Sequence, residues 1–185
     1  MNTAQDQPTL RYRPGVGMML LNSQQQVFVG KRARHSRELA FQKENHKTTV
    51  SLPSDAADIW QMPQGGIDGD ELPDKAVLRE LEEEIGTRHV QILSQAKNWL
   101  YYDLPDPLKG QLWGGRFVGQ RQIWFLGQFT GNDQDINIHT AHPEFCDWKW
   151  VAPSELSQLV VSFKKDLYHQ VLTLFTPLLR PALQL

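Results

Sequence analysis

The stretch PQGGIDGDELPDKAVLRELEEEIG, from Pro63 to Gly86, holds four of its glutamates within five positions. Like charges at helical spacing repel one another, so such a cluster is unfavourable unless something binds to it. Proline is common in the first turn of a helix and glycine just past its end. Pro73 and Gly86 therefore predict a helix over residues 73–85, directly after a loop that contains a pair of glycines.

The predicted helix has an apolar face and an acidic face. At about 100° per residue, the apolar face consists of Val77, Leu81 and Ile85. The acidic face follows the i, i+3, i+4 spacing and consists of Glu80, Glu83 and Glu84. Carboxylate oxygens grouped in this way suit Mg²⁺ or Mn²⁺. A bound divalent cation would remove the repulsion between the glutamates, so the sequence predicts a metal site on this face.

A solvated acidic face is the alternative to a metal site, and the surroundings argue against it. Gly65 and Gly66 precede the helix and let the backbone come close to a ligand. Arg79 lies beside the glutamates and can orient a carboxylate through a bidentate contact. Residues 1–50 hold eight Lys/Arg and three Asp/Glu, and residues 51–100 hold four Lys/Arg and ten Asp/Glu. A basic segment and an acidic segment suit a metal–phosphate site, whereas the net charge of −2 excludes a global basic field for long nucleic acid.

Length and composition are those of one ordinary domain. The chain has 185 residues, of which 40% are hydrophobic and 22% are charged, so it can build a core. No apolar run approaches the roughly 20 residues that a bilayer span needs, and the first residues lack the layout of a signal peptide. The single cysteine, Cys146, cannot form an internal disulfide. These features predict a cytoplasmic protein that does not bind membranes.

The order of the predicted elements favours a mixed α/β domain. Apolar residues at 16–22 and 26–31 flank a polar turn and predict a hairpin. Further strands are predicted at 89–95, 98–104, 120–131 and 145–151. Ser162 is predicted to N-cap a last helix, whose apolar stripe runs from Phe163 to Leu178. Polar residues at about 35–58 lack a period and predict a long surface loop.

The opening stretch also resembles a known motif, the Nudix box, G-x5-E-x7-R-E-U-x-E-E-x-G-U, where U is a bulky aliphatic residue. Its fixed positions are matched by Gly65, Glu71, Arg79, Glu80, Leu81, Glu83, Glu84 and Gly86. Thr87 at the final U is the one departure, and it concerns packing rather than chemistry. The resemblance implies the Nudix fold, an α/β fold in which a mixed β-sheet is sandwiched between helices.

Flanking segments resemble the bacterial RNA pyrophosphohydrolase branch of this family, which has also been described as dinucleoside polyphosphate hydrolases. They are YRPGVG (12–17), WQMPQGG (60–66), NWLYYDLP (98–105), GQRQIWFL (119–126), HPEFCDWKWV (142–151) and VVSFKKDLY (160–168). The resemblance implies one Nudix domain over 10–180 after a flexible N-terminus at 1–9, with the Nudix box at 65–87. Relative to this branch the loop at 35–58 is an insertion, which could cap the site, contact a partner or simply be tolerated.

The resemblance also implies roles for individual residues. The expected ligands of Mg²⁺ or Mn²⁺ are Glu80, Glu83, Glu84 and Glu144. The expected catalytic residues are Glu83, Glu84, Glu144 and Arg79. The general base is either Glu84 or Glu144, because carboxylates that bind metal have overlapping roles. The residues expected to support the loop and the helix are Gly65, Gly66, Glu71 and Gly86.

Contacts with substrate are implied at positions where this branch grips the 5′ phosphates and first bases of RNA: Arg13, Arg32, Phe163 and Lys164. Arginine suits bidentate contact with phosphate, and an aromatic ring can stack on a base. Phe163 could equally pack in the core. Gln122 could meet a base edge or be an exposed strand residue.

The implied activity is that of a metal-dependent pyrophosphohydrolase, which removes pyrophosphate from the 5′-triphosphate end of RNA and so initiates transcript decay. One alternative is a diadenosine polyphosphate hydrolase that releases ATP. Another is a non-catalytic Nudix module that senses a nucleotide, which the intact glutamates disfavour. The expected partner is therefore 5′-triphosphorylated RNA or a dinucleoside polyphosphate, and no protein partner is implied.

Overall fold

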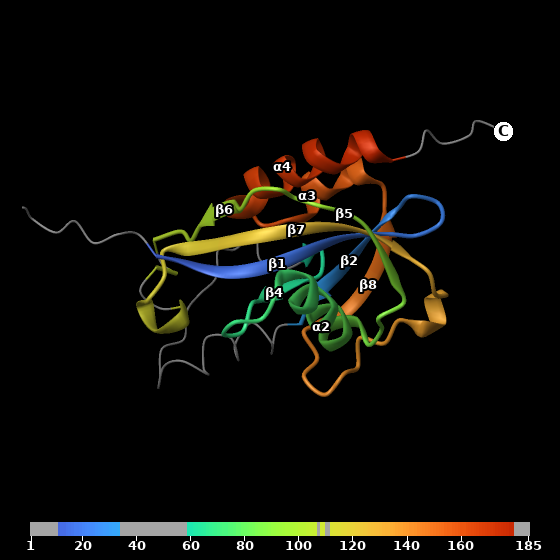
Figure 1. Ribbon diagram of the computed structural model, residues 1–185, viewed down its shortest axis with the longest axis horizontal. Coiled ribbons are helices and arrows are strands. Elements are labelled where there is room, and N and C mark those ends of the chain that lie inside the picture. The colour runs from blue at the N-terminus through green and yellow to red at the C-terminus, as the bar shows by residue number, and fades with distance from the viewer. Residues whose placement is uncertain (1–10, 34–58, 107, 110–111, 180–185) are drawn as a thin grey trace, which may run out of the picture.

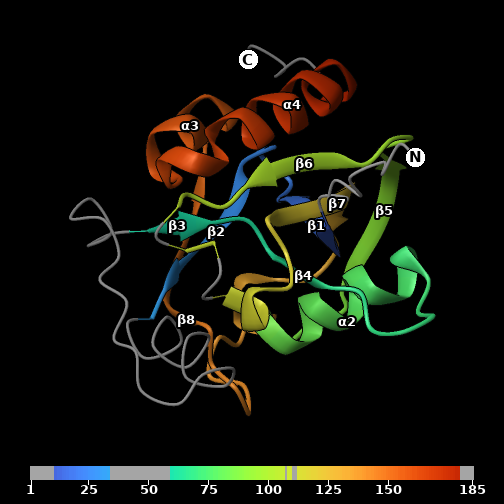
Figure 2. The same cartoon turned by 90° about the vertical axis from the view of Figure 1, so that its left-hand side faces the viewer.

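The computed structural model describes residues 11–33, 59–106, 108–109 and 112–179. The predicted loop at 35–58 and the predicted flexible N-terminus at 1–9 lie outside these residues. Within the described residues, eight strands form one sheet (Figures 1 and 2): β1 (Tyr12–Leu21), β2 (Val27–Arg32), β3 (Trp60–Gln61), β4 (Gln64–Gly66), β5 (Val90–Gln95), β6 (Leu100–Asp103), β7 (Gly119–Phe129) and β8 (Phe145–Val151).

The centre of the sheet is the parallel pair of β1 and β7, in register from Tyr12↔Gly119 to Leu21↔Gln128. All other pairs are antiparallel: β1 pairs with β2 and β4, β2 with β3 and β8, and β7 with β5 and β6. The sheet is therefore mixed. Its short strand β4 carries the glycine pair and lies against the middle of β1, which places the glycine loop at the centre of the molecule.

Helices cover both faces of the sheet (Figures 1 and 2). Helix α2 (Pro73–Ile85) lies on one face, and α3 (Leu156–Leu159) and α4 (Lys165–Phe175) lie on the other. Successive side chains of β1 point to opposite faces of the sheet and so contribute to both cores. Met18 and Leu20 pack in the cluster under α2, whereas Met19 and Leu21 pack in the cluster under α4. The predicted α/β fold, with a mixed sheet sandwiched between helices, is confirmed.

Helix α2 begins and ends where the sequence predicts. Pro73 occupies its first position, and Gly86 follows its end with φ of 72°, a left-handed conformation that favours glycine. A Cβ atom at Gly86 would lie 2.8 Å from the carbonyl oxygen of Asn137, so this glycine also permits a close approach of another segment. Leu81 and Ile85 on the apolar face are fully buried.

The hairpin and the later strands are confirmed, but two details of the last helix are wrong. Residues Ser162–Lys164 form a 3-10 turn, and α4 begins only at Lys165 without a side-chain cap. Leu178 is 55% exposed, because α4 ends at Phe175 and a second 3-10 turn follows. Among the described residues, none of the helices has both the length and the apolar character that crossing a bilayer requires.

Candidate active site

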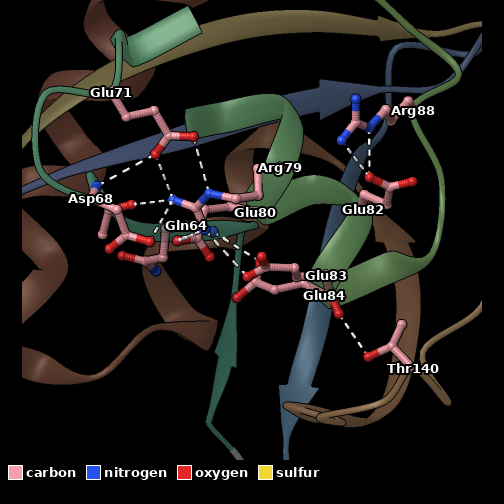
Figure 3. A network of polar contacts seen from close by, with 11 residues as sticks. Gln64, Asp68, Glu71, Arg79, Glu80, Glu82, Glu83, Glu84, Arg88 and Thr140 are labelled. Carbon is pink, nitrogen blue, oxygen red and sulfur yellow. Dashed lines mark hydrogen bonds and ion pairs between the residues drawn. The ribbon is translucent and has the colours of Figure 1, made fainter. Parts of the chain in front are cut away.

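Arg79 on α2 is the centre of the polar network in Figure 3. Its Nε and Nη2 donate to the two carboxylate oxygens of Glu71, at 3.0 and 2.8 Å, which makes a bidentate pair. Nη2 also donates to the carbonyl oxygen of Gly66 at 2.9 Å. Nη1 donates to Glu80 at 3.0 Å and to Glu83 at 3.3 Å. Arg79 therefore joins the glycine loop to the helix and neutralises part of the acidic face.

The two glycines of β4 make room for charged side chains. A Cβ atom at Gly65 would lie 1.9 Å from the carboxylate carbon of Glu80, and one at Gly66 would lie 2.4 Å from Nη2 of Arg13. Neither position can hold a side chain without moving these groups. Because Gly65 and Gly66 have no side chains, the carboxylate of Glu80 and the guanidinium of Arg13 can both lie against β4.

Burial raises the pKa of two glutamates on α2. Glu84 is 2% exposed; its Oε2 accepts a hydrogen bond from the backbone N–H of Gln64 at 3.0 Å, and its Oε1 has no hydrogen-bond partner among the described residues. Burial, followed by the charges of Glu144 and Glu80, raises the pKa of Glu84 well above its usual value. Burial also raises the pKa of Glu80 to about 7, against the opposing effect of Arg79.

Glu144 reaches the site from a different part of the chain, directly before β8. Its carboxylate lies 3.4 Å from Nη2 of Arg32, and its carbonyl oxygen accepts a hydrogen bond from the backbone N–H of Ala33. Its charge contributes to the raised pKa of both Glu80 and Glu84. The negative charge of Glu144 therefore adds to that of the glutamates on α2 in the same site.

The chemistry of these residues fits a divalent cation. Glu84 offers a buried oxygen without a donor, and the charges of Glu80 and Glu144 both disfavour its ionisation, so a cation would stabilise the group. In the conformation described, no three His, Cys, Asp or Glu side chains in the described parts of the chain converge closely enough to hold an ion.

A cavity of about 420 Å³ opens beside the glutamates. Its acidic residues include Glu80, Glu83 and Glu144, while Glu84 lies behind them. Its basic residues include Arg13, Arg32 and Lys164. The structure thus gathers the predicted metal ligands and the predicted phosphate contacts around one cavity. Acidic and basic side chains around one cavity suit a polyphosphate with its cation.

Aromatic rings complete the cavity wall. Phe163 is half-buried, lines the cavity and also packs against the core under α4. Core packing is therefore confirmed, and stacking on a base stays a prediction. Trp113 faces the guanidinium of Arg13, which lies 5.3 Å from its ring centroid. Trp113 was not predicted from the sequence, since the loop that carries it gives no periodic signal.

A buried polar network borders the cavity and extends away from it. The side-chain oxygen of Gln64 accepts hydrogen bonds from Nζ of Lys164 and from Nε2 of Gln122, both at 3.1 Å. Gln122 in turn accepts a hydrogen bond from Nε1 of Trp124 at 3.0 Å. Burial lowers the pKa of Lys164 to about 7. This network fixes Gln64, whose backbone N–H holds Glu84.

Gln122 is buried, which contradicts one of its two predicted positions and leaves contact with a base edge a prediction. It is 0% exposed and does not line the cavity, so an exposed strand position is wrong, and contact with a base edge would require it to leave its present bonds. Gln120, two positions earlier on the same face of β7, lines the cavity and accepts a hydrogen bond from the hydroxyl of Tyr102 at 2.8 Å. The signal that could have found Gln64, Gln120 and Tyr102 is polar side chains in otherwise apolar strands.

The fold and the arrangement of glycine loop, Arg79 and glutamates define a class of protein. The NUDIX domain family model matches residues 11–171, and the chain belongs to this family. Among individual proteins, the chain is similar to relatives that are named RNA pyrophosphohydrolase. The one from Rhodospirillum rubrum is 50% identical over 162 residues, covering 88% of this chain and 86% of the relative. The one from Rickettsia typhi is 45% identical over 171 residues, covering 92% and 94%.

Solved structures agree on the fold. The E. coli dihydroneopterin triphosphate pyrophosphohydrolase has a TM-score of 0.60 at 15% identity, covering 88% of this chain and 97% of that chain. A C. elegans Ap4A hydrolase binary complex has a TM-score of 0.56 at 15% identity, covering 89% and 98%. At such identities the likeness concerns the fold alone.

Proposed function

We propose that this protein is a metal-dependent pyrophosphohydrolase that removes pyrophosphate from the 5′-triphosphate end of RNA and so initiates transcript decay. The observation that carries the proposal is the cavity, which is lined by Glu80 and Glu83 of α2, by Glu144 and by basic residues that can hold phosphates. Relatives 45–50% identical over most of the chain, which bear the name RNA pyrophosphohydrolase, support the same substrate.

Carboxylates would hold the cation in this proposal. The proposed ligands of Mg²⁺ or Mn²⁺ are Glu80, Glu83, Glu84 and Glu144. When bound, the cation supplies neutralisation of charge on the phosphate oxygens. The buried Oε1 of Glu84 and the raised pKa of Glu80 support this ligand set, because both groups are unfavourable as isolated anions. The bonds from Arg79 to Glu71 and to the carbonyl oxygen of Gly66 would keep α2 in place while the site binds and releases ligands.

The residues of the chain have distinct tasks in hydrolysis. Water adds to phosphorus, the bridging P–O bond breaks, and a base must accept the proton of the water. Glu144 lines the cavity whereas Glu84 lies behind its wall, which favours Glu144 as this base. Arg13 and Arg32 would neutralise and orient the phosphates, and Arg79 would keep Glu80 and Glu83 in position.

Lys164 and Phe163 would bind the first nucleotides. Lys164 lines the cavity next to Gln64, and burial, together with the charge of Arg32, lowers its pKa to about 7. A nearby phosphate would favour its charged form. Phe163 offers a ring on which a base can stack. We also propose that residues 10–180 are a single Nudix domain and that the protein acts in the cytoplasm, where its RNA substrate is made.

The proposal is tested with RNA that carries a label on either its γ or its α 5′ phosphate, incubated with the purified protein and Mg²⁺. We expect the γ label to leave as pyrophosphate and the α label to stay on monophosphorylated RNA. Diadenosine tetraphosphate serves as the comparison substrate, and kcat/KM should favour RNA. Failure to produce any monophosphorylated RNA would reject the proposal, and a preference for the dinucleotide would transfer it to the dinucleoside polyphosphate alternative.

A further inference from the structure

The carbonyl groups at the end of α2 are bound by a distant segment of the chain. The last carbonyls of a helix have no partner within the helix. In α2, the hydroxyl of Thr140 donates to the carbonyl oxygen of Glu83 at 2.7 Å (Figure 3), and the backbone N–H of Asn137 donates to that of Ile85 at 2.8 Å. Residues 136–144, which lead from these contacts to Glu144, therefore lie against the end of the helix.

The 136–144 segment is held at both ends. Near its start, Ile136 and Ile138 are 9% and 7% exposed and pack in the same core cluster as the apolar face of α2. Just beyond its end, Phe145 is buried on the backbone of β2: a Cβ atom at Gly30 would lie 2.4 Å from the Phe145 ring. Glu144 thus lies between residues that contact α2 and a residue, Phe145, that packs on β2.

This arrangement connects the two parts of the acidic site. Glu83 contributes its carboxylate to the cavity and its carbonyl to the bond with Thr140. Glu144, four residues after Thr140, contributes the carboxylate that acts on Glu80 and Glu84. Among the described residues, the bond made by Thr140 is therefore the last hydrogen bond with α2 before the chain reaches Glu144 and β8.

We propose that Thr140 is a positioning residue for the site: its hydroxyl fixes the 136–144 segment on α2 and so sets the place of Glu144 relative to the helix glutamates. The inference rests on the proposed role of these glutamates as metal ligands. Groups that orient ligands without touching the metal commonly change affinity or activity 10- to 100-fold when removed. Thr140 does not line the cavity and is not among the proposed ligands, so its effect would be one of placement.

The test compares three variants in which one hydroxyl is removed or kept. Thr140→Val removes the hydroxyl at constant shape, and Thr140→Ser keeps it. Thr173→Val is the matched control, because the hydroxyl of Thr173 also donates to a helix carbonyl, that of His169 at 2.9 Å, but on α4. The main measurement is Mn²⁺ binding to the substrate-free protein by calorimetry, which does not depend on the identity of the substrate.

We expect Thr140→Val to weaken Mn²⁺ binding about tenfold, and Thr140→Ser and Thr173→Val to bind as the wild type does. In the background of Glu144→Gln, Thr140→Val should have no further effect, because the carboxylate it positions is gone. Wild-type Mn²⁺ affinity in Thr140→Val, or a full additional loss in the double variant, would overturn the inference. Lowered thermal stability with unchanged Mn²⁺ affinity would show a structural role only and would also overturn it.

A second variant covers the case in which Thr140→Val does not fold. Insertion of one glycine between His142 and Pro143 leaves the Thr140 bond intact but displaces Glu144 along the chain. It should lose Mn²⁺ affinity to the same extent as Thr140→Val, and unchanged affinity would count against the inference. If the wild type binds Mn²⁺ yet does not hydrolyse RNA, the proposed substrate fails while the positioning role is still decided by these measurements.

Discussion

Removal of divalent metal should make the stability of the protein fall as pH rises from 5 to 7, because of Glu80. Its pKa in the folded state is about 7, against an ordinary value of 4.5, and burial is the main cause. A carboxyl whose pKa is raised on folding stabilises the fold fully below its unfolded pKa, and this contribution is lost as pH rises through the folded pKa. With its side chain 14% exposed, solvent screens the effect little.

The magnitude follows from the two pKa values. They differ by about 2.5, and each pKa unit corresponds to about 1.4 kcal/mol, so the full loss is about 3 kcal/mol. About 2 kcal/mol of it falls between pH 5 and pH 7, since the titration begins below this window and ends above it. Measurement should stop at pH 7, because the lowered pKa of Lys164, about 7 in the fold, makes stability rise with pH above that value.

The assay is urea unfolding at pH 5, 6 and 7 in the presence of a chelator, for the wild type and for Glu80→Gln. The wild type should lose about 2 kcal/mol more than the variant over this range, since the six histidines titrate in both proteins and cancel. Saturating Mg²⁺ should flatten the wild-type curve, because a cation binds the ionised carboxylate. Parallel curves for the two metal-free proteins would refute the reasoning that Glu80 is protonated by burial.

Three further substitutions test the site and its support. Glu83→Gln should lower kcat at least about a hundredfold with an unchanged urea midpoint, and turnover near the wild-type rate would remove Glu83 from the metal site. Gly65→Ala places a methyl group on the carboxylate of Glu80 and should weaken Mn²⁺ binding about tenfold or more by calorimetry; unaltered binding would mean that the loop yields. Tyr168→Phe leaves the backbone N–H of Met62, now bonded at 2.9 Å, without its partner and should cost about 1–3 kcal/mol in urea unfolding, while a wild-type stability would indicate that water replaces the hydroxyl.

The sequence predicts local features that depend on neighbouring residues. The bounds of α2 follow from Pro73 and Gly86, because the backbone preferences of proline and glycine suit the start and the end of a helix. The prediction that Ser162 caps the last helix is wrong because a 3-10 turn, packed with Phe163 against the core, comes between Ser162 and α4. A cap signal shows that a helix start is near, but tertiary packing decides how the turn before it closes.

The burial of a side chain is harder to predict from the sequence than the face of the sheet on which it lies. Alternation along β7 places Gln120 and Gln122 on the same side, and the structure agrees. It does not reveal that Gln122 is sealed beneath α4 by Gln64 and Trp124 while Gln120 reaches the cavity. That difference arises from partners distant in sequence. The same holds for Thr140, whose bond to α2 joins positions far apart in the chain.

The geometry of Arg79 explains how the crowded acids of α2 can be stable both with and without a cation. Its guanidinium donates hydrogen bonds on two sides. Nε and Nη2 bind Glu71 and the carbonyl of Gly66, and these bonds hold the glycine loop against the helix. Nη1 alone binds Glu80 and Glu83, at 3.0 and 3.3 Å. A cation that takes these two carboxylates therefore competes with one nitrogen only, and the loop keeps its support when the metal enters. Lysine at this position, a single ammonium without a fork, could not serve both sides at once.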